Sequence, residues 1–329
     1  MNNYYLFPFL ILFFYIINYA FIKNKILLDK IESSNHKKFL ISYNVPLSGG
    51  ILILIGIIFF TNEITSLDKI LFSSIFFIGL LSDLQKLKSP LIRLFLQFIV
   101  ILIILILNKD FDIQIRASYI DYLLQNYIVL KILFTLFCLL ILINGSNFID
   151  GLNGLCSGYY IVVIINIFIV SLKFDLTYDY NNLWILLQFL ITFLIFNLLS
   201  KSFLGDSGSY LISTYIGLFL IFFFDEFKYL ISPYFICLLL WYPAFENLFS
   251  IIRRKFVKKS FSTYPDNEHL HHFLFRLINK NIKNIKLSNS FSGIMINVIN
   301  FIFIYIGTNF INSSKILIFL IVFLVSLYL

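Results

Sequence analysis

Four short polar clusters interrupt an otherwise apolar sequence, and they hold the side chains that could carry out chemistry. The clusters lie at 82–86, 144–155, 204–209 and 265–272. Their titratable members include three aspartates and three histidines, namely Asp83, Asp150, Asp206, His269, His271 and His272. Each cluster alone has a structural interpretation, since aspartates cap helices and Asn-Gly stretches form turns. A zinc site at the histidines is disfavoured because the sequence places no fourth ligand nearby.

Together the clusters predict phosphate chemistry. Carboxylate oxygens are the ligands that Mg²⁺ prefers, particularly when substrate phosphates occupy its other positions. Histidine and arginine side chains suit a diphosphate because they combine positive charge with directed hydrogen bonds. In the second cluster, Asn147, Asp150 and Asn153 have the spacing of one helical face. The sequence therefore predicts Mg²⁺-dependent handling of a phosphorylated substrate, with Mn²⁺ as an alternative metal.

The elements that must position these clusters are membrane-spanning helices. Of the 329 residues, 60% are hydrophobic and only 13% are charged, whereas soluble domains have about 25% charged residues. This composition disfavours a soluble globule, a disordered chain and a disulfide scaffold. Apolar runs lie at 4–22, 47–61, 67–82, 90–107, 122–143, 157–172, 183–199, 208–224, 229–249, 289–309 and 314–329. We predict an all-α, polytopic integral membrane protein with about 11 transmembrane helices (10–11).

The basic residues predict how the chain lies in the membrane. With an N-out/C-in orientation, most of the 25 lysines and arginines fall in inner segments, as the positive-inside rule requires. Cytoplasmic loops then explain the net charge of +8 without a nucleic-acid partner. All four polar clusters fall at the inner face. We predict a single transmembrane catalytic domain over 1–329, whose long basic cytoplasmic loop at 250–288 carries the histidines.

The ordered motifs resemble those of the polyprenyl-phosphate N-acetylhexosamine-1-phosphate transferases, of glycosyltransferase family 4 type. This family includes the bacterial undecaprenyl-phosphate GlcNAc-1-phosphate transferases, and phospho-MurNAc-pentapeptide transferase is a relative. The matching stretches are 46–50, 79–84 with Pro90, Arg93 and Gln97 after it, 147–155, 205–209 and 265–272. The pattern His-Leu-His-His resembles the UDP-HexNAc branch, because the pentapeptide enzyme carries three consecutive histidines.

The resemblance implies an activity and roles for individual residues. The family transfers a sugar-1-phosphate from a UDP-sugar to a polyprenyl phosphate and releases UMP. By this resemblance Asp83, Asp150 and Asp206 are catalytic residues, and Asp206 and Asp150 are also metal ligands. The residues implied to line the nucleotide-sugar site or to bind its diphosphate are Asn147, Asn153, His269, His271, His272 and Arg276.

The same resemblance implies the partners and the location. The partners would be a UDP-N-acetylhexosamine, undecaprenyl phosphate and membrane lipid, and a homodimer is left open. The protein would be a multi-pass component of the bacterial inner membrane with its active site on the cytoplasmic face. Its product would begin a lipid-linked cell-envelope glycan of the O-antigen (lipopolysaccharide) or teichoic acid type.

Two residues depart from the family pattern and motivate alternative functions. Ser82 stands where the family usually has the first of two aspartates, and Asn153 stands where relatives often have aspartate. Because serine is not an effective base at neutral pH, a catalytically inactive relative that acts as a scaffold is one alternative. A membrane transporter of lipid or sugar is another. It would place charged residues near the middle of spans, where this sequence has almost none.

Overall fold

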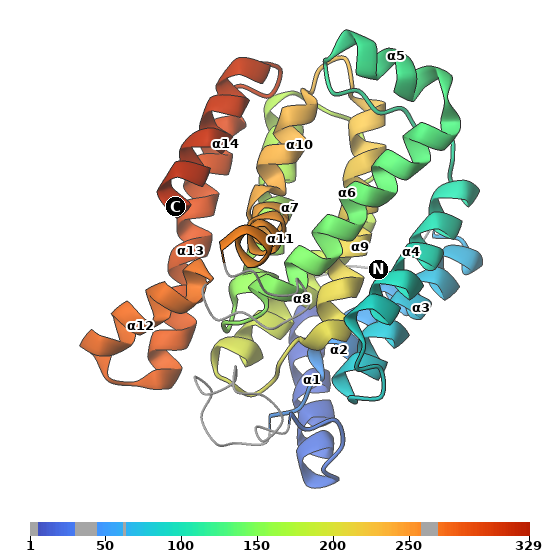
Figure 1. Cartoon of the computed structure of the whole chain (residues 1–329). Coiled ribbons are helices and arrows are strands. Elements are labelled where there is room, and N and C mark those ends of the chain that lie inside the picture. Colours follow the sequence, from blue (N-terminus) through green and yellow to red (C-terminus); the bar gives the residue numbers. More distant parts are fainter. Residues whose placement is uncertain (1–5, 30–44, 62–63, 258–268) are drawn as a thin grey trace.

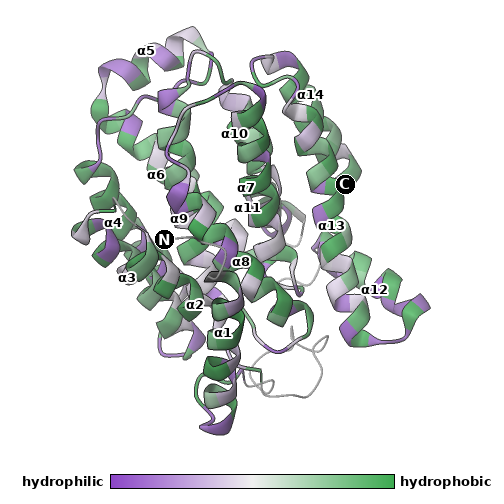
Figure 2. Cartoon of the chain, turned by 180° about the vertical axis from the view of Figure 1, so that it is seen from behind, coloured by the Kyte–Doolittle hydropathy of each residue, from purple (hydrophilic) through white to green (hydrophobic). Residues whose placement is uncertain are grey.

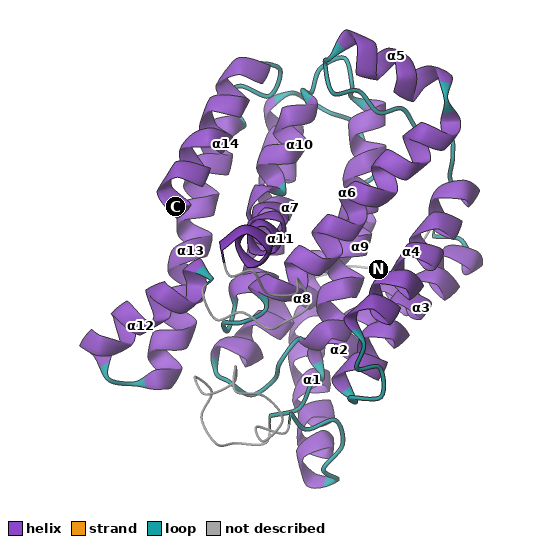
Figure 3. Ribbon diagram, in the orientation of Figure 1, coloured by secondary structure: helices purple, strands orange, loops and turns teal. Residues whose placement is uncertain are grey.

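The computed structural model describes residues 6–29, 45–61, 64–257 and 269–329, which fold into a bundle of helices (Figure 1). Figure 3 shows no strand among these residues, in which an isolated antiparallel bridge pairs Leu28 with Pro46. The predicted all-α fold class is confirmed. The helices of the first half are α1 (Leu6–Lys23), α2 (Gly49–Ile55), α3 (Ser66–Asp83), α4 (Pro90–Leu107), α5 (Ser118–Asn126) and α6 (Ile128–Ile149).

The second half of the chain continues the bundle. Its helices are α7 (Leu155–Lys173), α8 (Asn181–Leu198), α9 (Gly205–Glu226), α10 (Pro233–Leu239), α11 (Trp241–Ile252), α12 (Leu270–Ile282), α13 (Ile285–Gly307) and α14 (Ser314–Tyr328). Two helices run on into π-helical turns, α2 into Gly56–Phe60 and α11 into Arg253–Val257.

The helices have the length and composition of a polytopic membrane protein. Among the described residues, α4, α6, α7, α8, α9 and α13 are long and apolar enough to cross a membrane, and α10 with α11 makes a seventh if that bent pair is one span. Hydrophobic residues make up most of the long helices, while α5 and α12 include several hydrophilic ones (Figure 2). Each predicted apolar run contains a helix. The count of eleven and the N-out orientation stay predictions.

Helix α9 forms the centre of the bundle, and its first turn positions part of the site. It packs against α2, α3 and α6, and most of its side chains are buried. Gly79 of α3 permits this close approach, because a Cβ atom there would collide with the backbone of Ser207. The end of α3 therefore meets the start of α9, at the opposite end of the bundle from α5 (Figure 1).

The apolar run at 229–249 forms two helices rather than one straight span. Helix α10 ends at Leu239, and α11 leaves it at an angle of 76°. Pro243 explains the break, since in a continuous helix its ring would clash with the carbonyl group of the residue four positions earlier, Leu239. The bend carries α11 and its π-helical turn toward the polar clusters.

The region 250–288, predicted as a loop, is helical over most of its described part. After α11 and its π-helical turn, the chain is described again from His269, and α12 begins at Leu270. This helix packs against α13 and buries His271, Phe275 and Ile278. The first half of the fourth polar cluster, 265–268, lies outside the described residues.

Candidate active site

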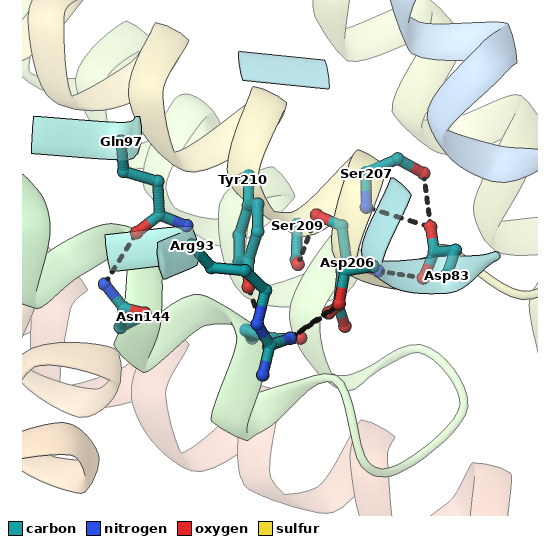
Figure 4. Close-up of polar contacts among 10 residues, drawn as sticks. Asp83, Arg93, Gln97, Asn144, Asp206, Ser207, Ser209 and Tyr210 are labelled. Atoms are coloured by element: carbon teal, nitrogen blue, oxygen red, sulfur yellow. Dashed lines mark hydrogen bonds and ion pairs between the residues drawn. The ribbon is translucent and has the colours of Figure 1, made fainter. Parts of the chain in front are cut away.

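Asp83 is the last residue of α3, and its carboxylate caps the N-terminus of α9 (Figure 4). It accepts hydrogen bonds from the backbone N–H groups of Asp206 (2.9 Å) and Ser207 (3.1 Å) and from the Ser207 hydroxyl (2.8 Å). Gly205 makes room for this carboxylate, because a Cβ atom at this position would lie 2.7 Å from Asp83 Oδ2. Its φ of 75° also favours glycine. These hydrogen bonds and the positive end of the α9 dipole favour the ionised form, but burial and the neighbouring Asp206 raise the pKa of Asp83 to about 7. Asp83 therefore sets the position of Asp206.

Asp206 lies in the first turn of α9, where Ser82 and Arg93 surround one of its oxygens. Arg93 Nη1 of α4 is 2.8 Å from Asp206 Oδ2, and the Ser82 hydroxyl donates to the same oxygen at 2.5 Å. Arg93 Nη1 also donates to Ser82 Oγ at 2.6 Å. The Asp206 and Arg93 side chains remain 23% and 22% exposed, so both stay accessible from the cavity described below. The serine that departs from the family pattern is thus part of the ion-pair network.

Amide side chains tie the end of α6 to α4 and α9 around this network (Figure 4). Asn144 Nδ2 donates to Gln97 Oε1 at 3.1 Å, and Asn147 Nδ2 lies 3.5 Å from the Tyr210 hydroxyl. Helix α6 ends at Ile149, so Asp150 is the first residue of the loop that follows. These contacts tie the end of α6 to α4 and α9, and Asp150 follows directly after this end.

Asn153 forms hydrogen bonds to other residues of the protein. Its backbone N–H donates to Asn289 Oδ1 of α13 at 2.6 Å, and its Nδ2 donates to Ser200 Oγ at 2.8 Å. The next residue, Gly154, donates to Asn197 Oδ1 at 2.5 Å and has a φ of 72°, which favours glycine. Helices α8 and α13 therefore fix the far end of the loop between α6 and α7.

The histidines form a stacked cluster at the start of α12. The rings of His269 and His271 lie 5.3 Å apart and nearly parallel, and the ring of His272 is 4.3 Å from that of His271. His269 Nδ1 forms a hydrogen bond with the buried carboxylate of Glu246 in α11. His271 is fully buried, and neither of its ring nitrogens has a hydrogen-bond partner among the described residues. Burial lowers the pKa of His271 well below its usual range, and the neighbouring His272 and His269 lower this pKa further.

One cavity of about 1300 Å³ brings these clusters together. The predicted site residues that line it are Asp83, Asp150, Asp206, Asn147, Asn153, His269, His271 and His272. They come from the ends of α3 and α6, the loop after α6, the start of α9 and the start of α12. A cavity with convergent polar groups of this kind is the usual form of a small-molecule site.

Arg276 is the one predicted site residue that does not line the cavity. It lies on the exposed side of α12, where its guanidinium group is 5.6 Å from the ring centroid of Phe273. On a helix, a residue five positions after His271 points away from the face that carries His271. His271 and Arg276 therefore lie on different faces of α12, whereas His272, four positions before Arg276, lies on the same side as Arg276.

The cavity also contains charged and aromatic residues that sequence reasoning did not assign to the site. Arg254 is buried in the wall and lies over the Phe148 ring at 5.3 Å, and the His269 ring lies 5.8 Å from the same ring. The sequence could have drawn attention to Arg93, since a charged residue within an apolar run is costly unless it is paired or functional. Arg254 could not be distinguished in sequence from its neighbours Arg253 and Lys255.

The cavity lining contains oxygen donors of the kind that Mg²⁺ prefers. Asp150 and Asp206 supply carboxylate oxygens and Asn147 supplies an amide oxygen, whereas Asp83 is engaged by the α9 N-terminus. The described residues contain no group of three or more His, Cys, Asp or Glu side chains arranged to hold a metal. Mg²⁺ commonly binds through one or two carboxylates plus substrate phosphates. A phosphorylated substrate would therefore have to complete the coordination.

Comparison with known proteins places this architecture in a family. The model of the family described as glycosyl transferase family 4 matches residues 68–224. The chain is 35% identical over 173 residues to the undecaprenyl-phosphate alpha-N-acetylglucosaminyl 1-phosphate transferase of Thermotoga maritima, covering 50% of the chain and 52% of that relative. It is 30% identical over 226 residues to the phospho-N-acetylmuramoyl-pentapeptide-transferase of Dictyoglomus turgidum, covering 64% of the chain and 69% of that relative.

A third relative spans more of the chain. The probable undecaprenyl-phosphate N-acetylglucosaminyl 1-phosphate transferase of Bacillus subtilis is 25% identical over 270 residues, which cover 79% of the chain and 71% of the relative. All three relatives are named as sugar-1-phosphate transferases, so the class is that of a membrane-embedded enzyme. The chain belongs to glycosyl transferase family 4, and the resemblance seen in its motifs is confirmed.

Proposed function

We propose that this protein transfers an N-acetylhexosamine-1-phosphate from a UDP-linked donor to undecaprenyl phosphate and releases UMP, with Mg²⁺ as cofactor. The observation that carries the proposal is the single cavity in which carboxylates, amides, histidines and an apolar wall meet. The names of the relatives support the acceptor and the transferred group. The product would begin a lipid-linked cell-envelope glycan, and the reaction would take place at the cytoplasmic face of a bacterial inner membrane.

The apolar wall of the cavity supports a lipid acceptor. It is formed by residues of α4, α6 and α11, namely Pro90, Leu91, Leu94, Phe137, Leu140, Ile141 and Ile251. Leu91 and Phe137 are 66% and 58% exposed, as expected where the cavity opens to lipid. Arg93 lies on α4 between Leu91 and Leu94 in the sequence and contacts Asp206. A polyprenyl chain against this wall would therefore bring its phosphate to Arg93.

A second group of lining residues supports a nucleotide diphosphate. Arg254 and the histidines supply cationic or hydrogen-bonding groups, and Phe148 offers an aromatic face beside them. His271 is expected to be neutral at pH 7 because burial lowers its pKa. Its buried ring nitrogens lack a partner among the described residues, and a ligand in the cavity that His271 lines would supply one.

The chemistry is an exchange of one phosphoanhydride bond for another. A phosphate oxygen of the acceptor forms a bond to the β-phosphorus of the donor, and the bond from this phosphorus to the UMP oxygen breaks. A phosphate monoester has a second pKa near 6, so the acceptor is largely dianionic at pH 7 and needs no base to remove a proton. This removes the chemical objection to Ser82. Bound Mg²⁺ would neutralise charge between the two phosphates.

An assay on the purified chain in detergent tests the proposal. Undecaprenyl phosphate, Mg²⁺ and a panel of UDP-HexNAc donors are supplied, and UMP release and lipid-linked product are measured. We expect product with at least one donor, complete loss with a chelator, and reversal when UMP is added. Binding of donor without turnover would contradict the proposal and favour the scaffold.

A further inference from the structure

Glu246 is a buried carboxylate outside the groups that the proposed chemistry uses. It lies on α11, its side chain has no exposed surface, and its neighbours on that helix are largely apolar. Burying a carboxylate costs free energy unless a partner compensates it. The partner here is His269, the first histidine of the fourth cluster, whose side chain is 7% exposed.

The contact between the two residues determines how the imidazole is presented. Glu246 bonds to Nδ1 of His269, so Nδ1 carries the hydrogen when the carboxylate accepts. Nε2 is then the ring nitrogen that can interact with a ligand in the cavity, which His269 lines. A carboxylate that orients a histidine in this way is a common supporting element at sites that bind anions or metals.

A third segment completes the arrangement. The hydroxyl group of Tyr328, at the end of α14, lies beside the Glu246 carboxylate and accepts the backbone N–H of Leu270 at 3.3 Å. The Tyr328 ring packs edge-on against Phe245 and Phe249 of α11, with centroids 5.0 and 5.5 Å away. Helices α11 and α14 therefore both contact the start of α12, where the histidines begin.

We propose that Glu246 is a positioning residue for the donor diphosphate, because its carboxylate holds the His269 imidazole with Nε2 directed to phosphate oxygens in the cavity. This inference rests on the proposed function, since a UDP-linked donor has to occupy the cavity. Glu246 does not line the cavity itself. Its effect would reach the ligand through His269 and would grow with the number of phosphates in that ligand.

Calorimetric binding of uridine, UMP and UDP to the purified full chain, with Mg²⁺ present, tests the proposal. We expect Glu246→Gln to weaken UDP binding about tenfold, UMP binding less and uridine binding not at all. His269→Ala should give the same pattern, and Glu246→Gln should add nothing in the His269→Ala background. Trp241→Phe is the control. Trp241 lies on the same helix as Glu246 but does not line the cavity, and the substitution removes a buried hydrogen bond from Trp241 to Asn300 of α13 (2.7 Å).

The outcomes separate the two proposals. A wild-type chain that binds none of the three ligands would overturn the proposed donor and this inference with it. If the wild type binds UDP and Glu246→Gln binds it with unchanged affinity, the positioning role alone is overturned. Equal losses of uridine and UDP affinity in Glu246→Gln would have the same meaning. If Glu246→Gln does not fold, Tyr328→Phe decides the matter. A severalfold loss confined to the phosphorylated ligands supports the role, and no loss contradicts it.

Discussion

The two sides of the cavity satisfy their polar groups in opposite ways. At the junction of α3 and α9, Asp83 receives three hydrogen bonds and Asp206 is paired with Arg93 and Ser82. At the start of α12, His271 is buried with both ring nitrogens unpartnered. The carboxylate side is preorganised by the protein, whereas the histidine side keeps hydrogen-bonding capacity for a ligand. Changes on the first side should therefore disturb catalysis and folding together, and changes on the second should disturb binding.

The largest effect is expected from Asp206→Asn. The charge of this carboxylate is needed at the proposed metal site, and an amide oxygen is a weaker ligand. We expect turnover to fall by about 10³-fold or more, measured as initial rates of UMP release at saturating donor. Asp225→Asn, at the other end of α9, is the matched control and should keep near-normal turnover. Full turnover in Asp206→Asn would show that the metal assignment is wrong.

Asp83→Ala should reduce both activity and stability. It removes the cap of α9, which contributes about 1–2 kcal/mol, and releases Asp206 from its position. We expect turnover to fall by about 100-fold, together with a lower unfolding temperature in detergent. Thr65→Ala removes a cap at the far end of α3, where Thr65 accepts from the Asp68 N–H at 3.1 Å. This control should lower stability and leave turnover unchanged, so equal loss of activity in both variants would contradict a local role for Asp83.

His271→Ala tests the ligand-binding side. Because His271 is expected to be neutral at pH 7, its contribution should come from hydrogen bonds rather than charge. We expect UDP affinity to fall by about tenfold. This factor should be nearly the same at low and high ionic strength. Arg254→Gln should behave differently, since a charged contact weakens as salt increases. A His271→Ala loss that disappears at high salt would indicate that the ring is cationic.

Ser82→Ala should have a moderate effect. The Arg93–Asp206 ion pair remains, while one hydrogen bond to Asp206 Oδ2 is lost. We expect turnover to fall about fivefold, compared in the same assay with Ser74→Ala, whose hydroxyl bonds only to the Ile70 carbonyl among its described contacts. A loss as large as that of Asp206→Asn would mean that the hydroxyl group itself takes part in the chemistry.

Arg276→Ala should have the smallest effect. The side chain is exposed and outside the cavity, so we expect donor KM to change by less than about twofold. Arg254→Ala is the informative comparison. The guanidinium group of Arg254 lines the cavity, so its removal should raise the donor KM by about tenfold. A large KM increase in Arg276→Ala would show that α12 turns in the substrate complex.

Local sequence determined the helices and the chemical groups of this protein. Hydropathy is a sum over neighbouring residues, so most apolar runs could be assigned to one helix in the correct place, whereas the runs at 122–143 and 229–249 each include parts of two helices. The motifs named the carboxylates, amides and histidines, and eight of the nine predicted side chains line one cavity. The break in the run at 229–249 also has a local cause, which is Pro243. The apolar composition of this run did not predict whether the span would be straight or bent.

Only the tertiary structure decided which partner each group has. Asp83 became a helix cap and Asp206 an ion-pair partner because α3, α4 and α9 pack at one point, although Asp83 and Asp206 are far apart in the sequence. Asn153 is held by α13, and Glu246 reaches His269 only because α11 is bent toward α12. Hydrogen bonds act over about 3 Å, so the use made of a side chain depends on which helix ends packing brings within that distance.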